Sequence, residues 1–316
     1  MDASENEQSI SIGGKVFFYL KNRLNGGKVF VNPGKSDYLR TASPTEIANE
    51  VALTKTLCAR GFPVPEVIAI GTLESGMAYY IERSIGDRVF GDIFREETKS
   101  NGRVSDESFD EFVSVTKKYC DAQFDPKNLV PADRAALAGV TEIENVMRNN
   151  PPSPAIAKMF AEAHTKACER VMSLPWGYIQ YDFNSFNVLR GGVIDFEFAG
   201  LGPVGYDALT STHFGRMWPK NRVAYVITDD QIARYVNEVD KVAVAKGLPT
   251  ISSYTNDFLL LKAIWSTSKE KASESNPGSN ADFWEWRTKM RDWCIRRYLN
   301  SEKIDSNQFE AVAAAS

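Results

Sequence analysis

Short apolar runs rich in β-branched and aromatic residues, separated by polar turns, dominate the first quarter of the chain. The clearest are KVFFYLKNR, KVFV, PEVIAIG and GMAYYIERS, at residues 15–23, 28–31, 65–71 and 76–84. The Asn-Gly pair between the first two runs is the strongest short signal for a β-hairpin. This pattern predicts a small lobe of about five antiparallel strands.

One helix interrupts these strands. Residues 43–61 read SPTEIANEVALTKTLCARG, in which Ser43 can cap the helix and Glu46 completes a capping box. Pro44 suits the first helical turn, and Gly61 is a typical stop signal. The sequence therefore predicts a helix with both ends marked.

After Gly86, apolar residues recur every three or four positions, which is the period of a helix. The strongest such segments are residues 106–124, 153–174, 228–247 and 281–299. The sequence thus predicts an α+β protein with two lobes. Residues 1–83 form the sheet-containing lobe, and residues 84–316 form a larger, mainly helical lobe.

Composition and charge exclude several classes of protein. Hydrophobic residues make up 43% of the 316 residues and charged residues 25%, which is typical of a soluble protein with a sizeable core. A net charge of −4 and a pI near 5.5 argue against a nucleic-acid-binding surface. The polar start MDASENEQSI is unlike a signal peptide, and no run approaches the roughly 18 apolar residues that span a bilayer. We expect a soluble cytoplasmic monomer or homodimer with no nucleic-acid or membrane partner.

Cysteine and histidine usage argues against a zinc enzyme or a disulfide framework. The four cysteines are scattered and form no C-x-x-C pair: Cys58, Cys120, Cys168 and Cys294. Only two histidines accompany them. Buried thiols in a reducing compartment fit this pattern best.

Residues 179–200, IQYDFNSFNVLRGGVIDFEFAG, carry the candidate chemistry. The turn signal at Arg190–Val193 predicts a hairpin in which Asn187 lies opposite Phe196 and Asp195 lies opposite Val188. Strict alternation would then point Asn187 and Asp195 to opposite faces, so we expect at least one of them to lie off the regular ladder.

An amide oxygen and a carboxylate that converge at strand ends suit Mg²⁺, which takes hard oxygen ligands and leaves room for phosphates. Asn187 and Asp195 are therefore the candidate metal ligands. Asp182 precedes them on a tight loop and is a separate carboxylate, free to accept a proton from an attacking hydroxyl.

At this point the sequence resembles the aminoglycoside phosphotransferase and choline kinase-like small-molecule kinases. Their usual motifs are HGD-L-x-x-x-N-V-L, V-I-D-W/F-E and G-x-P-x-x-D, and here they read QYDFNSFNVL, VIDFE and GPVGYD, at residues 180–189, 193–197 and 202–207. The resemblance implies a bilobal protein kinase-like fold and transfer of a phosphoryl group from Mg·ATP to a small-molecule hydroxyl. It also implies that Asp182 is the catalytic base, that Asn187 and Asp195 hold Mg²⁺, and that Asp207 braces the loop.

The small lobe supplies further candidates by the same resemblance. Glu50 lies among the apolar residues of the predicted helix, where kinase-like folds use a glutamate to hold the lysine that contacts the phosphates. Gly13 and Gly14 fall where the phosphate-covering loop is expected. The backbone around Glu82 and Ser84 would bind the adenine edge.

The phosphate-binding lysine departs from the family pattern. The family places it at the end of the third strand, which we identify as Lys28–Val31, so the expected position is Asn32. An amide does not neutralise phosphate charge. A relocated lysine is the alternative, and Lys28 is favoured over Lys21 and Lys35. Each of these lysines also has a plain interpretation as a solvated surface residue.

A second departure is Gln180, which stands where the family commonly has histidine. Two functions therefore remain open. The chain is a phosphotransferase acting on a hydroxyl of a small molecule, or a kinase-like nucleotide-binding protein with weak or no phosphoryl transfer. The intact set of Asp182, Asn187 and Asp195 favours the first.

The sequence leaves the acceptor open. Aromatic residues of the last long helix predict either core packing or an aromatic wall around an amine or flat ring. They are Phe283, Trp284, Trp286 and Trp293. Acidic residues predict either solvated helix faces or a negative pocket for a polycationic aminoglycoside. They are Asp229, Asp230, Asp282, Glu285 and Asp292.

Overall fold

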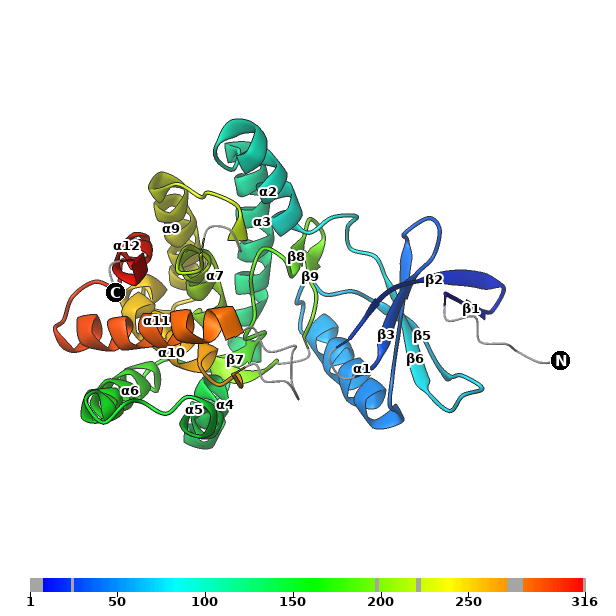
Figure 1. Ribbon diagram of the computed structural model, residues 1–316. Helices are drawn as coiled ribbons and strands as arrows, with labels where there is room; N and C mark the ends of the chain where they lie inside the picture. The colour runs from blue at the N-terminus through cyan, green and yellow to red at the C-terminus, as the bar shows by residue number, and fades with distance from the viewer. Residues whose placement is uncertain (1–7, 24–25, 197–198, 220–222, 272–280, 315–316) are drawn as a thin grey trace.

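A computed structural model describes residues 8–23, 26–196, 199–219, 223–271 and 281–314. Figure 1 shows a sheet-containing N-lobe beside a larger helical C-lobe, with the chain termini at opposite ends of the molecule. Within the described ranges, no helix combines the length and the apolar character that a membrane crossing requires. The predicted fold class is confirmed. Because the sheet ends at Arg83, we propose that the lobes divide between residues 83 and 84.

The N-lobe contains an antiparallel sheet with the strand order β1-β2-β3-β4-β6-β5. Its strands are β1 Ser9–Ile12, β2 Lys15–Asn22, β3 Lys28–Val31, β4 Asp37–Ala42, β5 Val67–Thr72 and β6 Ala78–Arg83. The sheet has one strand more than we expected. The unexpected strand is β4, which lies at the centre of the sheet and leads directly into the helix.

Helix α1, Pro44–Ala59, begins as its sequence predicts. The Ser43 side chain and the Glu46 backbone and side chain form the reciprocal bonds of a capping box. Ile47 and Val51 pack against Tyr80 and neighbouring sheet residues. The helix therefore covers one face of the sheet.

The C-lobe is built from helices around one large core. Its long helices are α2 Phe90–Asn101, α3 Asp106–Gln123, α4 Arg134–Thr141, α5 Ile143–Asn149, α6 Ala157–Val171, α7 Tyr206–Arg216, α9 Asp229–Ala245, α10 Thr255–Ser266, α11 Ala281–Leu299 and α12 Phe309–Ala314. Short 3-10 turns lie at Pro126–Asn128, Ile251–Tyr254 and Ser306–Gln308. The four predicted helical segments correspond to α3, α6, α9 and α11.

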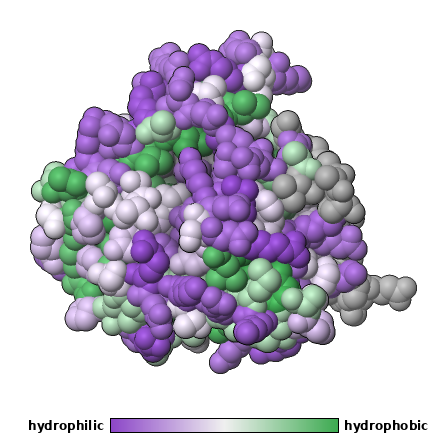
Figure 2. Space-filling view, turned by 90° about the vertical axis from the view of Figure 1, so that its left-hand side faces the viewer, coloured by the Kyte–Doolittle hydropathy of each residue, from purple (hydrophilic) through white to green (hydrophobic). Residues whose placement is uncertain are grey.

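Helix α10 is almost wholly buried at the centre of this lobe, where it packs against α6, α7 and α11. A helix that is apolar on all sides has no polar stripe to reveal its period, which explains why the sequence pattern does not predict it. The surface of the lobe is different. On the face seen in Figure 2, hydrophobic patches are small and separated by hydrophilic side chains.

Two small two-stranded sheets carry the motif residues. Strands β7, Trp176–Ile179, and β10, Gly200–Pro203, pair with each other, and β8, Val188–Leu189, pairs with β9, Gly192–Val193. The turn between β8 and β9 is Arg190-Gly191, with Val188 opposite Val193. Asn187 consequently lies opposite Ile194, whose N–H donates to the Asn187 carbonyl at 2.9 Å. The predicted register was therefore wrong by two residues.

The β8–β9 hairpin joins the two lobes. The Gly191 N–H donates to the Ile85 carbonyl and the Val193 N–H donates to the Pro63 carbonyl, each at 2.7 Å. A Cβ atom on Gly191 would lie 2.2 Å from the Ile85 oxygen, and one on Gly192 would lie 2.0 Å from the Pro63 oxygen. This close approach of two backbones explains the Gly-Gly pair.

Replacing Gly192 by alanine tests this contact. We expect Gly192→Ala to destabilise the protein by about 1–3 kcal/mol, because the hairpin must move away from Pro63. The free energy of unfolding in urea measures the effect. Gly34→Ala is the matched control, since no atom lies within 4 Å of its added Cβ. Equal stability of the two variants would contradict the proposed steric role.

Candidate active site

A buried carboxylate positions the loop that precedes β8. Asp207, at the start of α7, is only 1% exposed. Its oxygens accept hydrogen bonds from the Tyr119 hydroxyl at 2.6 Å and from the backbone N–H groups of Gln180 at 2.6 Å and Tyr181 at 3.0 Å. Burial raises the pKa of Asp207, and these hydrogen bonds oppose the rise. Asp207 therefore braces the loop, as the resemblance implied.

The loop backbone is strained at Tyr181, whose φ of 67° lies in the left-handed region. The related motif has glycine at this position. Here the Tyr181 hydroxyl donates to the Leu201 carbonyl at 3.1 Å, and its own carbonyl accepts a hydrogen bond from the Lys262 ammonium. These contacts, together with Asp207, hold a conformation that a tyrosine alone would disfavour.

Gln180 links the loop to the segment that follows β9. Its side-chain amide donates to the carbonyls of Ile194 at 3.1 Å and Asp195 at 2.7 Å. The side chain is completely buried, so these bonds are sheltered from water. Gln180 therefore connects the two segments through its amide.

Asp182 and Asn187 lie together. The Asn187 amide nitrogen donates to the Asp182 carbonyl at 2.9 Å and lies 3.5 Å from the Asp182 carboxylate. The Asn184 amide also donates to the Asp182 carbonyl, at 2.7 Å. Asn187 thus fixes the backbone that carries the Asp182 carboxylate.

Asp195 lies off the ladder, as the alternation argument required. It lies two residues after the end of β9 and adopts a left-handed backbone with φ of 66°. Since the Asn187 amide nitrogen is committed to Asp182, its oxygen faces elsewhere, and it has no hydrogen-bond partner among the described residues. One amide oxygen and one carboxylate fit a hard cation such as Mg²⁺. Glu197, the last residue of the VIDFE motif, lies outside the described residues.

Two arginines occupy the N-lobe side of this site. Arg40, on β4, donates to Glu82 on β6 at 2.7 Å, and their side chains are only 12% and 7% exposed. Burial lowers the pKa of Arg40, but the charges of Glu82 and Asp195 help to raise it overall, so the guanidinium remains cationic. Arg40 is therefore a fixed positive charge near Asp195.

The second arginine engages the helix glutamate. Arg23, at the end of β2, donates to Glu50 at 2.6 Å, and the Tyr80 hydroxyl donates to the other Glu50 oxygen at 3.1 Å. The Arg23 side chain is 5% exposed, and its Nη1 atom has no hydrogen-bond partner among the described residues. Glu50 thus holds a cation, as the resemblance implied, but that cation is not a lysine.

Charged side chains from both lobes line one cavity between the lobes. They are Arg23, Arg40, Glu50, Glu82 and Asp195. Its volume is about 30 Å³, which is room for a single water molecule rather than for a triphosphate. Nucleotide can enter only if these side chains or the lobes move apart.

Comparison with known proteins gives the family. The phosphotransferase enzyme family matches residues 28–237, which is more than half of the chain. The chain belongs to this family. No curated protein matches its sequence.

Solved structures of phosphotransferases share the fold. The apo form of a thermostable aminoglycoside phosphotransferase APH(4)-Ia has 17% identity and a TM-score of 0.59, and the match covers 92% of this chain and 96% of that one. Its ternary complex with ADP and hygromycin B has 16% identity and a TM-score of 0.58, covering 89% and 93%. A GDP complex of an aminoglycoside 2'-phosphotransferase has 13% identity and a TM-score of 0.55, covering 93% and 95%.

The structure places Lys28 and Lys35 away from Arg40 and the cavity between the lobes. Lys28 lies opposite Thr41, whereas Val29 lies opposite Arg40, so Lys28 points to the other face of the sheet from Arg40. Asn32 and Lys35 belong to the β3–β4 turn, in which the Asn32 side chain accepts from the Ser36 N–H at 2.9 Å. The assignment of the lysine position to Asn32 was wrong, because the strand before the helix is β4.

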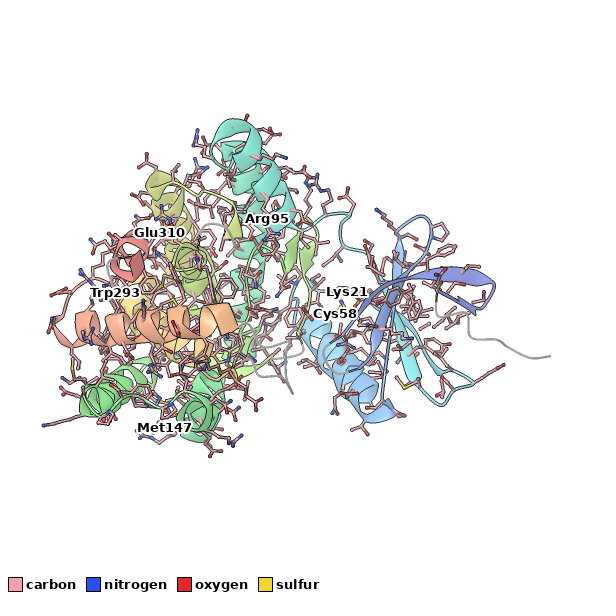
Figure 3. The ribbon with its side chains drawn as sticks, viewed as in Figure 1. Lys21, Cys58, Arg95, Met147, Trp293 and Glu310 are labelled. Carbon is pink, nitrogen blue, oxygen red and sulfur yellow. The ribbon has the colours of Figure 1, made fainter. Side chains whose placement is uncertain are left out.

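Lys21 lies at the end of β2 nearest the C-lobe and is labelled in Figure 3. It is opposite Val29, so it shares the sheet face of Arg40, but its side chain is exposed. Gly13 and Gly14 form the β1–β2 turn, which Figure 1 shows on the side of the N-lobe farthest from the helices. Gly26 follows Arg23 instead, and its N–H donates to the Arg23 carbonyl at 3.2 Å.

The hinge residues have structural partners. The Ser84 N–H donates to the Ser36 carbonyl, and its hydroxyl donates to the Gly86 carbonyl, both at 2.8 Å. Glu82 uses its side chain to bind Arg40. The prediction that the backbone here binds adenine stays a prediction.

Arg40 and Arg23 are the site residues that sequence reasoning missed. The available signal was the segment DYLRTA, in which Tyr38 and Arg40 share one face and which ends at the Ser43 cap. Recognising it as the strand before the helix would have identified Arg40.

A second cavity, of about 560 Å³, opens beside Asp182 in the C-lobe. The acidic residues that suggested a negative pocket do not line this cavity, as far as the structure describes them. They are Asp229, Asp230, Glu285 and Asp292, and the side chain of the fifth, Asp282, lies outside the described residues. Trp286 donates to the Met217 carbonyl at 2.8 Å and Trp293 packs on Phe309, so these aromatic residues belong to the core.

Replacing Asp207 by asparagine tests the brace. We expect Asp207→Asn to destabilise the protein by about 2–3 kcal/mol, because an amide NH₂ would face backbone N–H donors and leave buried groups unpaired. Urea unfolding measures this loss. Asp125→Asn is the matched control, since Asp125 caps a surface turn through the Lys127 N–H and asparagine caps equally well. A stability of Asp207→Asn equal to the control would contradict the bracing role.

Proposed function

We propose that this chain transfers the γ-phosphoryl group of ATP to a hydroxyl of a small molecule. Membership of the phosphotransferase family supports phosphoryl transfer. The geometry of the site supports the roles proposed for Asp182, Asn187 and Asp195. The observation that carries the proposal is the arrangement around Asp182. Its backbone is fixed by Asn187, and Asp182 lines an open cavity.

In the proposed step, Asp182 orients the acceptor hydroxyl and accepts its proton. The hydroxyl oxygen forms a bond to the γ-phosphorus, and the bond from that phosphorus to the β–γ bridging oxygen breaks, which releases ADP. Asn187 positions the carboxylate through the Asp182 backbone. Positioning of this kind accounts for much of phosphoryl-transfer catalysis.

Asn187 and Asp195 would hold Mg²⁺, which neutralises phosphate charge when bound. Gln180 supports Asp195 by binding its carbonyl, and this contact fixes the start of the segment that carries the carboxylate. The donor set and its fixed backbone support the proposed metal site.

Arg40 and Arg23 are proposed to contact the phosphates in place of a lysine. A guanidinium stays charged and binds phosphate through two parallel hydrogen bonds. Glu82 and Glu50 would orient the two arginines. The turn with Gly26 is the proposed phosphate-covering loop, in place of Gly13 and Gly14.

A nucleotide-binding protein with weak or no transfer is the second candidate. Gln180, which stands where the family commonly has histidine, is the observation that motivates it. Asn32 no longer supports this candidate, because it lies in a turn. The cytoplasmic location and the monomeric or homodimeric state stay predictions.

Turnover separates the two candidates. We expect Mg·ATP to raise the melting temperature and ATP with a chelator to raise it less. A screen of hydroxyl compounds should then give ADP release, and Asp182→Asn should lower kcat by about 10²–10⁴ while nucleotide binding persists. Asp133→Asn, at the cap of α4, is the control. Unchanged turnover in Asp182→Asn would reject Asp182 as the base, and a melting temperature unaffected by nucleotide would reject the proposed function.

Replacing Arg40 tests whether its guanidinium contacts the phosphates in place of a lysine. We expect Arg40→Gln to weaken Mg·ATP binding by about tenfold or more, because a charge-assisted contact is lost, and Arg40→Lys to retain part of the affinity. Isothermal calorimetry measures both. Arg103→Gln removes a surface ion pair with Asp106 and serves as the control. Equal affinity in Arg40→Gln and the control would exclude Arg40 from the phosphate site.

A further inference from the structure

The cavity beside Asp182 has its own charge character. Its lining comes from the catalytic loop and from helices of the C-lobe, and it shares no lining residue with the cavity between the lobes. If Asp182 is the base, as proposed above, the acceptor must occupy this cavity. Its lining therefore reports the chemistry of the acceptor.

Cationic side chains dominate that lining. They are Arg95, Lys262, Lys269 and Arg287, and Asp182 is the one carboxylate among the described lining residues. Glu142 is close by, but it accepts a hydrogen bond from the Trp265 indole at 3.0 Å and does not line the cavity. A polycationic acceptor would meet like charges here, whereas an anionic acceptor would meet opposite charges.

Helices of the C-lobe hold these cations in place. Lys262 is 3% exposed, and its ammonium binds the Tyr181 carbonyl and lies 3.8 Å from the centre of the Trp265 ring. Burial lowers the pKa of Lys262, and the charges of Asp182 and Asp207 oppose this change. The carboxylates of Asp182 and Asp207 thus favour the charged form of Lys262, against the effect of burial.

The two arginines are held in the same manner. Arg95, labelled in Figure 3, donates to the Val223 carbonyl at 3.0 Å and stacks 4.3 Å from the Phe186 ring. Arg287 donates to the Ser266 carbonyl at 3.3 Å and lies 5.1 Å from the Trp218 ring. Such fixed donors lose little freedom when an anion binds.

Aromatic rings form another part of the wall. Phe186, Trp218, Tyr225 and Trp265 line the cavity and provide flat apolar surfaces. A volume of about 560 Å³ fits a small organic molecule. Cations arranged on aromatic walls favour a ligand with an apolar or aromatic body and a negative group.

We infer that the acceptor is an anionic small molecule, with a carboxylate or phosphate on an aromatic or apolar framework that also bears the reacting hydroxyl. The cations of the cavity offset the repulsion between this acceptor and the triphosphate. This inference rests on the proposed function and narrows its substrate class away from aminoglycosides.

Three probes that differ mainly in charge test the inference. They are 4-(hydroxymethyl)benzoate, 4-(hydroxymethyl)benzamide and 4-(hydroxymethyl)benzylamine, which share one ring and one primary alcohol. Their dissociation constants are measured by calorimetry on the full chain, with and without Mg·ADP. We expect the carboxylate to bind about tenfold more tightly than the amide, and the amine to bind most weakly.

Equal affinities, tighter binding of the amine, or no binding of any probe would overturn the inference. The proposed function fails separately, if Mg·ATP leaves the melting temperature unchanged. Turnover of amines but not of acids would keep the proposed function and reject the anionic acceptor.

Variants of the lining residues test which side chains produce the preference for the carboxylate over the amide. Arg287→Gln and Lys269→Gln should each lower the affinity for the carboxylate more than the affinity for the amide, so that the ratio falls. Lys269 is exposed, so we expect Lys269→Gln to fold and to give an affinity ratio even if Arg287→Gln fails to fold. Lys127→Gln is the control, since its side chain is 66% exposed and outside the cavity. An unchanged ratio in both pocket variants would overturn the inference.

Discussion

The buried carboxylate of Asp207 is the interaction on which the candidate active site depends. It takes three hydrogen bonds inside the C-lobe, two of them from the backbone of Gln180 and Tyr181. A buried charge is costly unless such donors surround it, so the loop and the carboxylate stabilise each other. The strained backbone of Tyr181 persists because Asp207 fixes one side of this residue and Lys262 the other. The position of the loop that carries Asp182 therefore depends on this anchor.

The same logic extends to the boundary between the lobes. The Gly191–Gly192 pair allows the C-lobe hairpin to approach the N-lobe backbone closely, and Asp195 lies two residues after the end of this hairpin. Arg40 faces Asp195 from the N-lobe, and Glu82 holds it there. The two arginines at the cleft are therefore paired with glutamates, with little space left around them. Phosphates and Mg²⁺ would need more space than this cavity provides, which links nucleotide binding to a change in the cleft.

Sequence reasoning predicted the elements that carry strong local signals. Helix α1 has a capping box and a glycine stop, and both of these act within a few residues. Asp182, Asn187 and Asp195 were chosen from a dense motif. Strand β4 was missed because we took β3, which ends just before Asn32, to be the strand that carries the phosphate-binding lysine. The strand that leads into the helix is β4. Arg40 was missed with it, since its role depends on strand order rather than on local spacing. The hairpin register was wrong because a Gly-Gly pair also supports a turn that begins one residue earlier.

The acceptor cavity shows why a family and a fold leave the substrate open. The loop of the proposed base, Asp182, would fix where a hydroxyl must lie, but other walls come from α2, α10 and α11, which the motif does not constrain. Net charge gave no indication of the cavity's character, because the chain is acidic overall while the lining is cationic. Of the acidic residues that suggested an aminoglycoside site, Asp229 pairs with Arg216 and Asp292 pairs with Arg291. Local charge at the point of binding, rather than the sum over the chain, determines which acceptor is attracted.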